Sequence, residues 1–306
     1  MTRYVARRLL QVPVPLLLIS IVVFALVRIT GDPAVLYLGQ DATPEQIRTL
    51  QQQLGLDQPI WIQYVRYVRQ AAQGDMGRSL RYRRPALAVV VERLPFTALL
   101  ATTGLLLAAL AGVVIGVVST RYRGTWGDVF LVGLSVTGQA MPNFWLGVVL
   151  VLFFAVRLQW LPTSGAGEWR HLVLPSVTLA SFIMPHMMLL TRTALLEVMQ
   201  DQYVTVARAK GLPERRVLYR HALRNALNPV VAYVGLQFGN LMGGSVITEI
   251  IFAWPGVGQL TIQSIFNRDA PVVVAAVIIL ALIIVLCNLA ADIANALVDP
   301  RIRIQA

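Results

Sequence analysis

The side chains that most often carry catalysis or hold metal ions are few in this chain and lie far apart. Its three histidines, His171, His186 and His221, have no metal-ligand spacing, and its single cysteine, Cys287, lies inside an apolar run. One cysteine can form neither a disulfide within the chain nor a thiolate metal cluster. No glycine-rich phosphate loop occurs either. We therefore expect no catalytic residue, no metal site and no cofactor or nucleotide bound by this chain itself.

Four residues in or beside long apolar runs are candidates for a transport pathway or its gate. Gln139 and Asn143 flank a proline, and Met187 belongs to a group of methionines that could form an adaptable lining, although helix bridging and packing are the simpler roles. Glu249 follows 24 charge-free residues, and ionisable groups at membrane depth are functional candidates by default. At a span end, an outer gate or an ion pair, for example with Arg268, explains Glu249 better than substrate contact.

A basic, polar segment between two apolar runs is the most conspicuous place for a soluble partner to bind. We expect a helix to continue from the preceding span as far as Tyr203, a turn to form at Gly211, and a second short helix to run from Glu214 to Tyr219. Such a compact knob could enter another protein's cleft, or it could be an ordinary basic loop. The candidate contact residues are Thr205, Ala207, Arg208, Ala209, Lys210, Gly211, Leu212, Pro213, Glu214 and Arg215.

Composition places the chain among polytopic membrane proteins. Of its 306 residues, 57% are hydrophobic and only 13% are charged, whereas soluble domains carry about 25% charged residues. The net charge of +11 comes almost wholly from arginine. No nucleic-acid-binding motif accompanies this charge, so we assign it to membrane topology and partner contacts and expect no nucleic acid partner.

Six apolar runs are each long enough for a helix to cross the roughly 30 Å hydrocarbon core of a bilayer. We therefore predict an all-α polytopic membrane protein with six transmembrane helices in a lipid bilayer. The predicted spans are residues 9–30, 96–120, 129–156, 172–192, 229–250 and 272–294, of which the last five form one transmembrane domain, 96–296, with a cytoplasmic loop at 193–228 and an external loop at 251–271.

The charges of the short loops predict the orientation. Arginines gather at both termini, between spans two and three, and between spans four and five, whereas the opposite short loops hold few. The positive-inside rule therefore places residues 1–8 and 295–306 in the cytoplasm. Residues 31–95 also hold eight arginines, but a loop longer than about 60 residues crosses the membrane largely regardless of its charge.

Residues 31–95 are predicted to form a small helical external insertion between the first two spans. Thr43-Pro44-Glu45-Gln46 combines a cap residue, a first-position proline and a third-position glutamine, and Gly55 would end that helix. A second helix is predicted from Pro59 to Gln73. The insertion could be a lid over the span ends or a docking surface for an external partner. The sequence favours neither role over the other.

A family resemblance rests first on the cytoplasmic segment. Val206-Ala207-Arg208-Ala209-Lys210-Gly211, with its flanking residues 201–203 and 221–227, resembles the cytoplasmic loop of peptide-type ABC importer permeases, which handle dipeptides, oligopeptides, glutathione and nickel. The general signature, Glu-Ala-Ala followed by three residues and Gly, falls on residues 205–211, where the Glu and the first Ala are absent. Further motifs similar to that family are Gly31-Asp32-Pro33-Ala34, Leu54-Gly55-Leu56-Asp57-Gln58-Pro59, Gly74-Asp75-Met76-Gly77-Arg78-Ser79, Leu161-Pro162-Thr163, Trp254-Pro255-Gly256-Val257-Gly258, Arg268-Asp269-Ala270-Pro271 and Asp299-Pro300-Arg301.

The resemblance implies a type I ABC importer permease of the bacterial inner membrane, a subunit with no catalytic activity. In that family two permeases, here expected as a heterodimer, form the pore, and two ATPase subunits beneath it bind ATP and Mg²⁺. An external binding protein delivers the substrate, here a small peptide or glutathione, with nickel or another non-peptide solute as the alternative. The helix after Gly211 would fit a groove on one ATPase, so that ATPase closure rocks the spans between inward-facing and outward-facing states.

Two other classes of protein fit the sequence less well. An ion-coupled secondary transporter would place carboxylates or histidines deep inside its spans and show repeated halves, whereas the acids here lie at span ends and no half repeats. An intramembrane enzyme would need a Ser/His/Asp, His-Glu-x-x-His or paired-carboxylate arrangement within the apolar runs, and the sequence has none.

Overall fold

The computed structural model describes residues 8, 10–29, 35 and 42–298 of the chain. Within these ranges the chain forms helices joined by turns, with one isolated bridge between Arg78 and Pro85 and no strand. The prediction of an all-α fold is therefore confirmed. The termini predicted to be cytoplasmic, 1–8 and 295–306, and the motifs at 31–34 and 299–301 lie largely or wholly outside the described residues.

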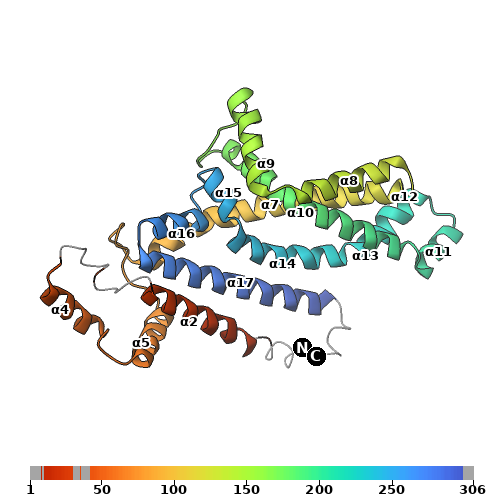
Figure 1. Ribbon diagram of the computed structural model, residues 1–306. Helices are drawn as coiled ribbons and strands as arrows, with labels where there is room; N and C mark the ends of the chain where they lie inside the picture. The colour runs from red at the N-terminus through yellow and green to blue at the C-terminus, as the bar shows by residue number, and fades with distance from the viewer. Residues whose placement is uncertain (1–7, 9, 30–34, 36–41, 299–306) are drawn as a thin grey trace.

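The long helices lie alongside one another, with α17 between α2 and α14 (Figure 1). α4, α5 and α6 precede α7 in the chain, and short helices join the long ones at both ends. In chain order the helices are α2 Pro13–Ile29, α4 Pro44–Leu54, α5 Ile60–Ala72, α6 Ala86–Val91, α7 Leu94–Arg121, α8 Trp126–Ala140, α9 Asn143–Leu150, η1 Val151–Arg157, α10 Trp169–Val198, α11 Gln202–Ala209, α12 Glu214–Arg216, η2 Val217–Ala222, α13 Leu223–Ala226, α14 Asn228–Gly244, α15 Val246–Ile251, α16 Val257–Phe266 and α17 Ala270–Val298.

Helix length and composition identify only some of the predicted spans. Three helical stretches, Ala86–Arg121, Trp169–Val198 and Ala270–Ala294, are long and apolar enough to cross a bilayer, and α8 with α9 and η1 could make a fourth. α2 is a shorter apolar helix, and α14 has 17 residues. The count of six spans therefore stays a prediction.

The stretch predicted as the third span, 129–156, is two helices that meet at a bend of 100°. α8 ends at Ala140, and Met141 and Pro142 are extended before α9 begins at Asn143. Proline has no N–H to donate and moves the residue before it out of the helical region, so the break follows from the local sequence. This stretch cannot cross a bilayer as one straight rod.

The close contact between α7 and α10 forms the centre of the fold. Three glycines of α7, Gly104, Gly112 and Gly116, face α10, and a Cβ atom at Gly112 would lie 2.5 Å from the Cβ of Met187. Small residues let two helix backbones approach closely, which strengthens van der Waals contact where lipid offers no hydrophobic driving force between helices. Met187 is fully buried at this contact.

The two helices predicted within the insertion, residues 31–95, are confirmed as α4 and α5. Thr43 and Gln46 cap α4 reciprocally: the Thr43 N–H donates to Gln46 Oε1 at 2.9 Å, and the Gln46 N–H donates to Thr43 Oγ1 at 3.4 Å. Gly55 ends α4 with φ +66°. α5 packs on α2, where the Tyr64 hydroxyl lies 2.8 Å from Ser20 Oγ. Contact with α2 therefore helps to position the insertion.

A buried carboxylate fastens the end of the insertion to α17. Asp269 directly precedes α17, and it accepts hydrogen bonds from the Ser79 hydroxyl and from the N–H groups of Leu80 (3.1 Å) and Arg81 (3.3 Å). Asp269 is only 1% exposed, and the N-terminus of α17 also stabilises its charge. Two of the motifs that resemble the permease family, 74–79 and 268–271, thus meet in space.

Gly112→Ala should destabilise the chain by about 1–3 kcal/mol, because the added methyl group meets the Met187 side chain and the α10 backbone. Gly133→Ala on α8 is the matched control, since a Cβ atom there meets nothing within 4 Å. Thermal unfolding of both variants in detergent measures the difference. Equal midpoints for the two variants would contradict the close α7–α10 contact.

Candidate functional site

Residues 193–228, predicted to be cytoplasmic, form a compact group of short helices at one end of the long helices (Figure 1). The prediction that the helix of span four continues to Tyr203 is wrong. α10 ends at Val198, and Asp201 is extended, with φ −66° and ψ 147°, before α11 begins at Gln202. An extended residue cannot continue the α-helical hydrogen-bond ladder.

The second helix of this segment starts at Glu214, as predicted, but it does not end at Tyr219. It continues through η2 and α13 to Ala226. No proline or glycine interrupts residues 214–226, and Ala222 and Ala226 are fully buried against the end of α10. Burial of this face explains why the helix is longer than the sequence suggested.

The two arms of the segment pack together around Val204, Ala207 and Val217, which are buried beside the half-buried Leu212. Ala207 and Leu212, both predicted as partner contacts, therefore belong to the internal packing of the segment. The other predicted contact residues are exposed: Thr205, Arg208, Ala209, Lys210, Gly211, Pro213, Glu214 and Arg215.

The turn between the two arms depends on Gly211 and on an ion pair. Gly211 has φ +74°, in the left-handed region that favours glycine. Arg208 donates to both carboxylate oxygens of Glu214, at 2.7 and 3.2 Å, and this hydrogen bonding holds the pKa of Glu214 below its usual value. Both side chains are exposed, so the pair orders the turn more than it stabilises the fold.

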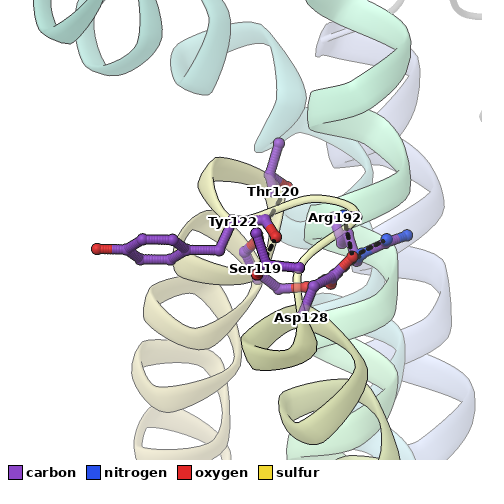
Figure 2. Close-up of polar contacts among 8 residues, drawn as sticks. Ser119, Thr120, Tyr122, Asp128 and Arg192 are labelled. Atoms are coloured by element: carbon purple, nitrogen blue, oxygen red, sulfur yellow. Dashed lines mark hydrogen bonds and ion pairs between the residues drawn. The ribbon is translucent and has the colours of Figure 1, made fainter.

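A second charged cluster joins three helices close to this segment, and sequence reasoning missed it (Figure 2). Asp128, in the first turn of α8, accepts hydrogen bonds from the Ser119 hydroxyl of α7 and from Arg192 of α10, with Arg192 Nη2 at 2.8 Å and Nε at 3.2 Å. Arg192 Nε also lies 3.0 Å from Ser119 Oγ. The side chains of Asp128 and Arg192 are 7% and 24% exposed.

This cluster connects the C-terminal end of α7, the start of α8 and the C-terminal third of α10. From the sequence, Arg192 contributed only one positive charge to the orientation predicted by the positive-inside rule. One signal in the sequence pointed to this cluster. Asp128 is a lone acid at the start of an apolar run, and buried carboxylates are commonly paired with a cation. Nothing in the sequence identified Arg192, 64 residues away, as that cation.

Glu249, predicted as a gate residue, is fully buried near the opposite ends of the same helices. Its Oε1 accepts hydrogen bonds from the hydroxyls of Thr97 (2.9 Å) and Ser245 (2.8 Å), and its Oε2 accepts one from the N–H of Gln259 (3.0 Å). Thr97 Oγ1 in turn accepts from the N–H of Val257 at 2.8 Å. The carboxylate thus connects α7, α15 and α16.

The suggested ion pair between Glu249 and Arg268 is not present in the structure. Neutral donors surround the carboxylate, while Arg268 is exposed at the end of the loop before α17. Two glycines make room for the carboxylate: a Cβ atom at Gly256 would lie 2.4 Å from Glu249 Cδ, and one at Gly258 would lie 2.9 Å from Oε2. The two glycines of the motif at 254–258 therefore leave room for the Glu249 side chain.

The other three pathway candidates lie in different surroundings. Met187 is buried between α7 and α10, so it does not line a surface in this conformation. Asn143 is half-buried at the start of α9, beside the bend. Gln139 is half-buried near the end of α8, and its amide nitrogen lies 3.3 Å from Nε2 of His186 on α10. Of the four candidates, only Gln139 joins a polar group on another long helix at the molecular surface.

The described residues contain no group of three or more His, Cys, Asp or Glu side chains that could hold a metal ion. The thiol of Cys287 packs at the α14–α17 contact, where a Cβ atom at Gly239 would lie 3.0 Å from Cys287 Cβ. The candidate site is a set of polar contacts between helices.

Comparisons with known proteins match the chain along nearly its whole length. A family described as the N-terminal part of binding-protein-dependent transport system membrane components matches residues 1–101, and the family of binding-protein-dependent transport system inner membrane components matches residues 112–304. The chain is 42% identical to a glutathione transport system permease protein, GsiC, of Salmonella paratyphi A and 40% identical to that of Escherichia coli K12. Each match covers 99% of both chains.

Solved structures show the same fold at lower sequence identity. Two inward-facing forms of the MetNI methionine ABC transporter match with TM-scores of 0.57 and 0.60 at 20% identity. Each match covers 70% of this chain and 98% of the transporter chain. An amino acid ABC transporter solved with histidines matches with a TM-score of 0.52 at 15% identity. The prediction of a type I ABC permease fold is confirmed by these matches.

Asp128→Asn should destabilise the chain by about 3 kcal/mol, the low end for a broken buried ion pair, because Arg192 stays partly exposed. The matched control is Glu92→Gln, which breaks the exposed Arg84–Glu92 pair and should leave the unfolding midpoint unchanged. Thermal unfolding in detergent compares the two variants. Equal losses, or none for Asp128→Asn, would show that the Asp128–Arg192 pair does not hold these helices together.

Proposed function

Since the chain belongs to the family of binding-protein-dependent transport system inner membrane components, we propose that it is a permease subunit of an ABC importer for small peptides, with glutathione as the first candidate. The observation that carries this proposal is 40–42% identity to glutathione transport permeases over 99% of both chains. The relatives compared above are named for glutathione, which favours a peptide over nickel as the substrate.

The exposed part of residues 205–215 is our assignment for contact with the ATPase subunits. Three apolar side chains are exposed beside its arginines: Tyr203 is 38% exposed, Val206 52% and Tyr219 47%. Exposed apolar groups ringed by charge suit a protein partner better than a lipid bilayer. Arg208 and Glu214 come from either side of the turn, so the ATPase groove would receive the turn and both arms rather than the second arm alone.

The partners and the orientation follow from this assignment. Residues 193–228 and both termini would lie in the cytoplasm, in agreement with the arginine distribution, and the chain would be a multi-pass protein of the bacterial inner membrane. Two ATPase subunits would bind ATP and Mg²⁺, and this subunit would be non-catalytic. A second, homologous permease would complete the pore, and an external binding protein would deliver the substrate at the end that carries α4, α5 and α16.

The two buried polar clusters would transmit movement of the ATPases through the helices. A displacement of the cytoplasmic segment reaches α10 directly, and the Arg192–Asp128 pair couples α10 to α7 and α8. At the other end, Glu249 holds α7 against α15 and α16, so it would stabilise one arrangement of the outer gate. Such packed elements with two arrangements are what alternating access requires.

The substrate assignment is tested by transport in proteoliposomes that hold this chain with its own second permease, ATPases and binding protein. Labelled glutathione should accumulate only when ATP and the binding protein are both present, because the family couples these partners to the permease. ADP in place of ATP is the control. Uptake of nickel without uptake of glutathione or any small peptide would overturn the assignment.

Gly211→Arg should reduce ATP-driven uptake at least about tenfold, because the new side chain extends from the turn into the ATPase groove and the left-handed backbone is strained. A Cβ atom at Gly211 meets nothing within 4 Å, so the isolated chain has room for the arginine. The matched control is Gly124→Arg in the neighbouring cytoplasmic turn, which also has a positive φ (+79°) and open space.

Uptake and ATP hydrolysis are both measured for the assembled transporter carrying either variant. The control variant pays the same backbone strain and adds the same charge, so it should retain uptake. Equal uptake by the two variants would remove the coupling role from the turn at Gly211.

A further inference from the structure

A row of polar side chains runs from the C-terminal end of α8 across the middle of α10 to α14. Gln139 Nε2 lies 3.3 Å from His186 Nε2, and the His186 ring lies near-parallel to that of Tyr233, with centroids 6.3 Å apart. Gln237 Nε2 donates to the Tyr233 hydroxyl at 3.0 Å, and Asn240 Nδ2 donates to Gln237 Oε1 at 2.8 Å. These five residues are called the polar row below.

The polar row lies on the surface of the chain. His186 and Asn240 are exposed, and Gln139, Tyr233 and Gln237 are half-buried. An exposed surface elsewhere on the long helices is apolar: Leu106, Leu110 and Val114 of α7 are 54%, 67% and 60% exposed. Polar groups that face hydrocarbon without partners are costly, so the row needs water, a solute or another polar surface in front of it.

We propose that the polar row is one wall of the water-filled path and contacts the solute as it passes. This proposal rests on the proposed function, because it takes a small peptide as the solute. The row offers amides, an imidazole and a phenol, which can donate to carboxylates and both donate to and accept from peptide groups. It contains no carboxylate or guanidinium, so each contact is weak enough for the solute to leave, as conduction requires.

The position of the row also connects it to the coupling machinery. His186 lies six residues before Arg192 on α10, and Gln139 lies near the C-terminal end of α8, whose first turn holds Asp128. α8 and α10 are therefore joined twice, by the Asp128–Arg192 pair and by the Gln139–His186 contact. A movement that reaches the ion pair also moves the wall of the path.

Cysteine accessibility in the complete transporter tests for water. Cys287→Ala removes the only cysteine of this chain, and His186→Cys, Asn240→Cys and Leu110→Cys are then made one at a time, with Arg123→Cys as an exposed reference. A charged methanethiosulfonate reagent is applied in nanodiscs, nucleotide-free and after vanadate trapping. The row positions should react at least about tenfold faster than Leu110→Cys in one of these states, because the hydrated thiolate is the reacting species.

Peptide uptake by the same transporter tests for contact with the solute. His186→Ala and Gln237→Ala should each raise KM for the transported peptide by about three- to tenfold, the effect of losing one hydrogen bond. Thr102→Ala is the control, since its exposed hydroxyl bonds only to Ala98 O of its own helix, and its KM should not change.

The outcomes separate the two proposals. Row cysteines that react as slowly as Leu110→Cys in both states would overturn the water-filled wall and indicate a buried contact with the second permease. Fast reaction with unchanged KM would overturn contact with the solute. Absence of uptake of any peptide by the unmodified transporter would overturn the proposed function, while the thiol reaction would still decide whether the row faces water.

Discussion

The contact between α7 and α10 fixes the positions of two buried polar clusters on which the remaining helices depend. α7 supplies Thr97 to the carboxylate of Glu249 and Ser119 to the Asp128–Arg192 pair. These two residues are 22 positions apart, about 33 Å along a helix, which is close to the thickness of the hydrocarbon core of a bilayer. Between them α7 approaches α10 through glycines. The buried charged groups therefore lie at two levels along α7, and between these levels the glycines of α7 pack against α10.

Helix starts and turns that depend only on neighbouring residues could be predicted from short sequence motifs. Thr43 and Gln46 identified the start of α4 because a capping box is complete within four residues, and Gly211 identified a turn because its conformation favours glycine. The break after α8 was also encoded locally, by Pro142, although the run of apolar residues concealed it. Apolar length alone could not distinguish a straight span from two helices at 100°.

The partners of buried charges could not be predicted, because the fold brings them together from distant parts of the chain. Arg192 counted only as a cytoplasmic charge until α8 placed Asp128 beside it. Glu249 invited an ion pair, yet hydroxyls of Thr97 and Ser245 and one backbone N–H satisfy it. Neutral donors leave no charge pattern in a sequence, so no count of acids and bases could have found them.

The two polar contacts between α8 and α10 restrict how these helices can move relative to each other. α8 contacts α10 at Asp128 and again at Gln139, 11 residues later, or about 17 Å along the helix. A helix held at two points on the same neighbour cannot slide along it without breaking both contacts. α8 and the C-terminal part of α10 should therefore move as one rigid body, and the bend at Met141–Pro142 is the position at which α9 can change its angle to α8. That rigid body carries both the connection to residues 193–228 and part of the polar row. Under the proposed function, a displacement of residues 193–228 by the ATPases would therefore reposition the polar row in the same step.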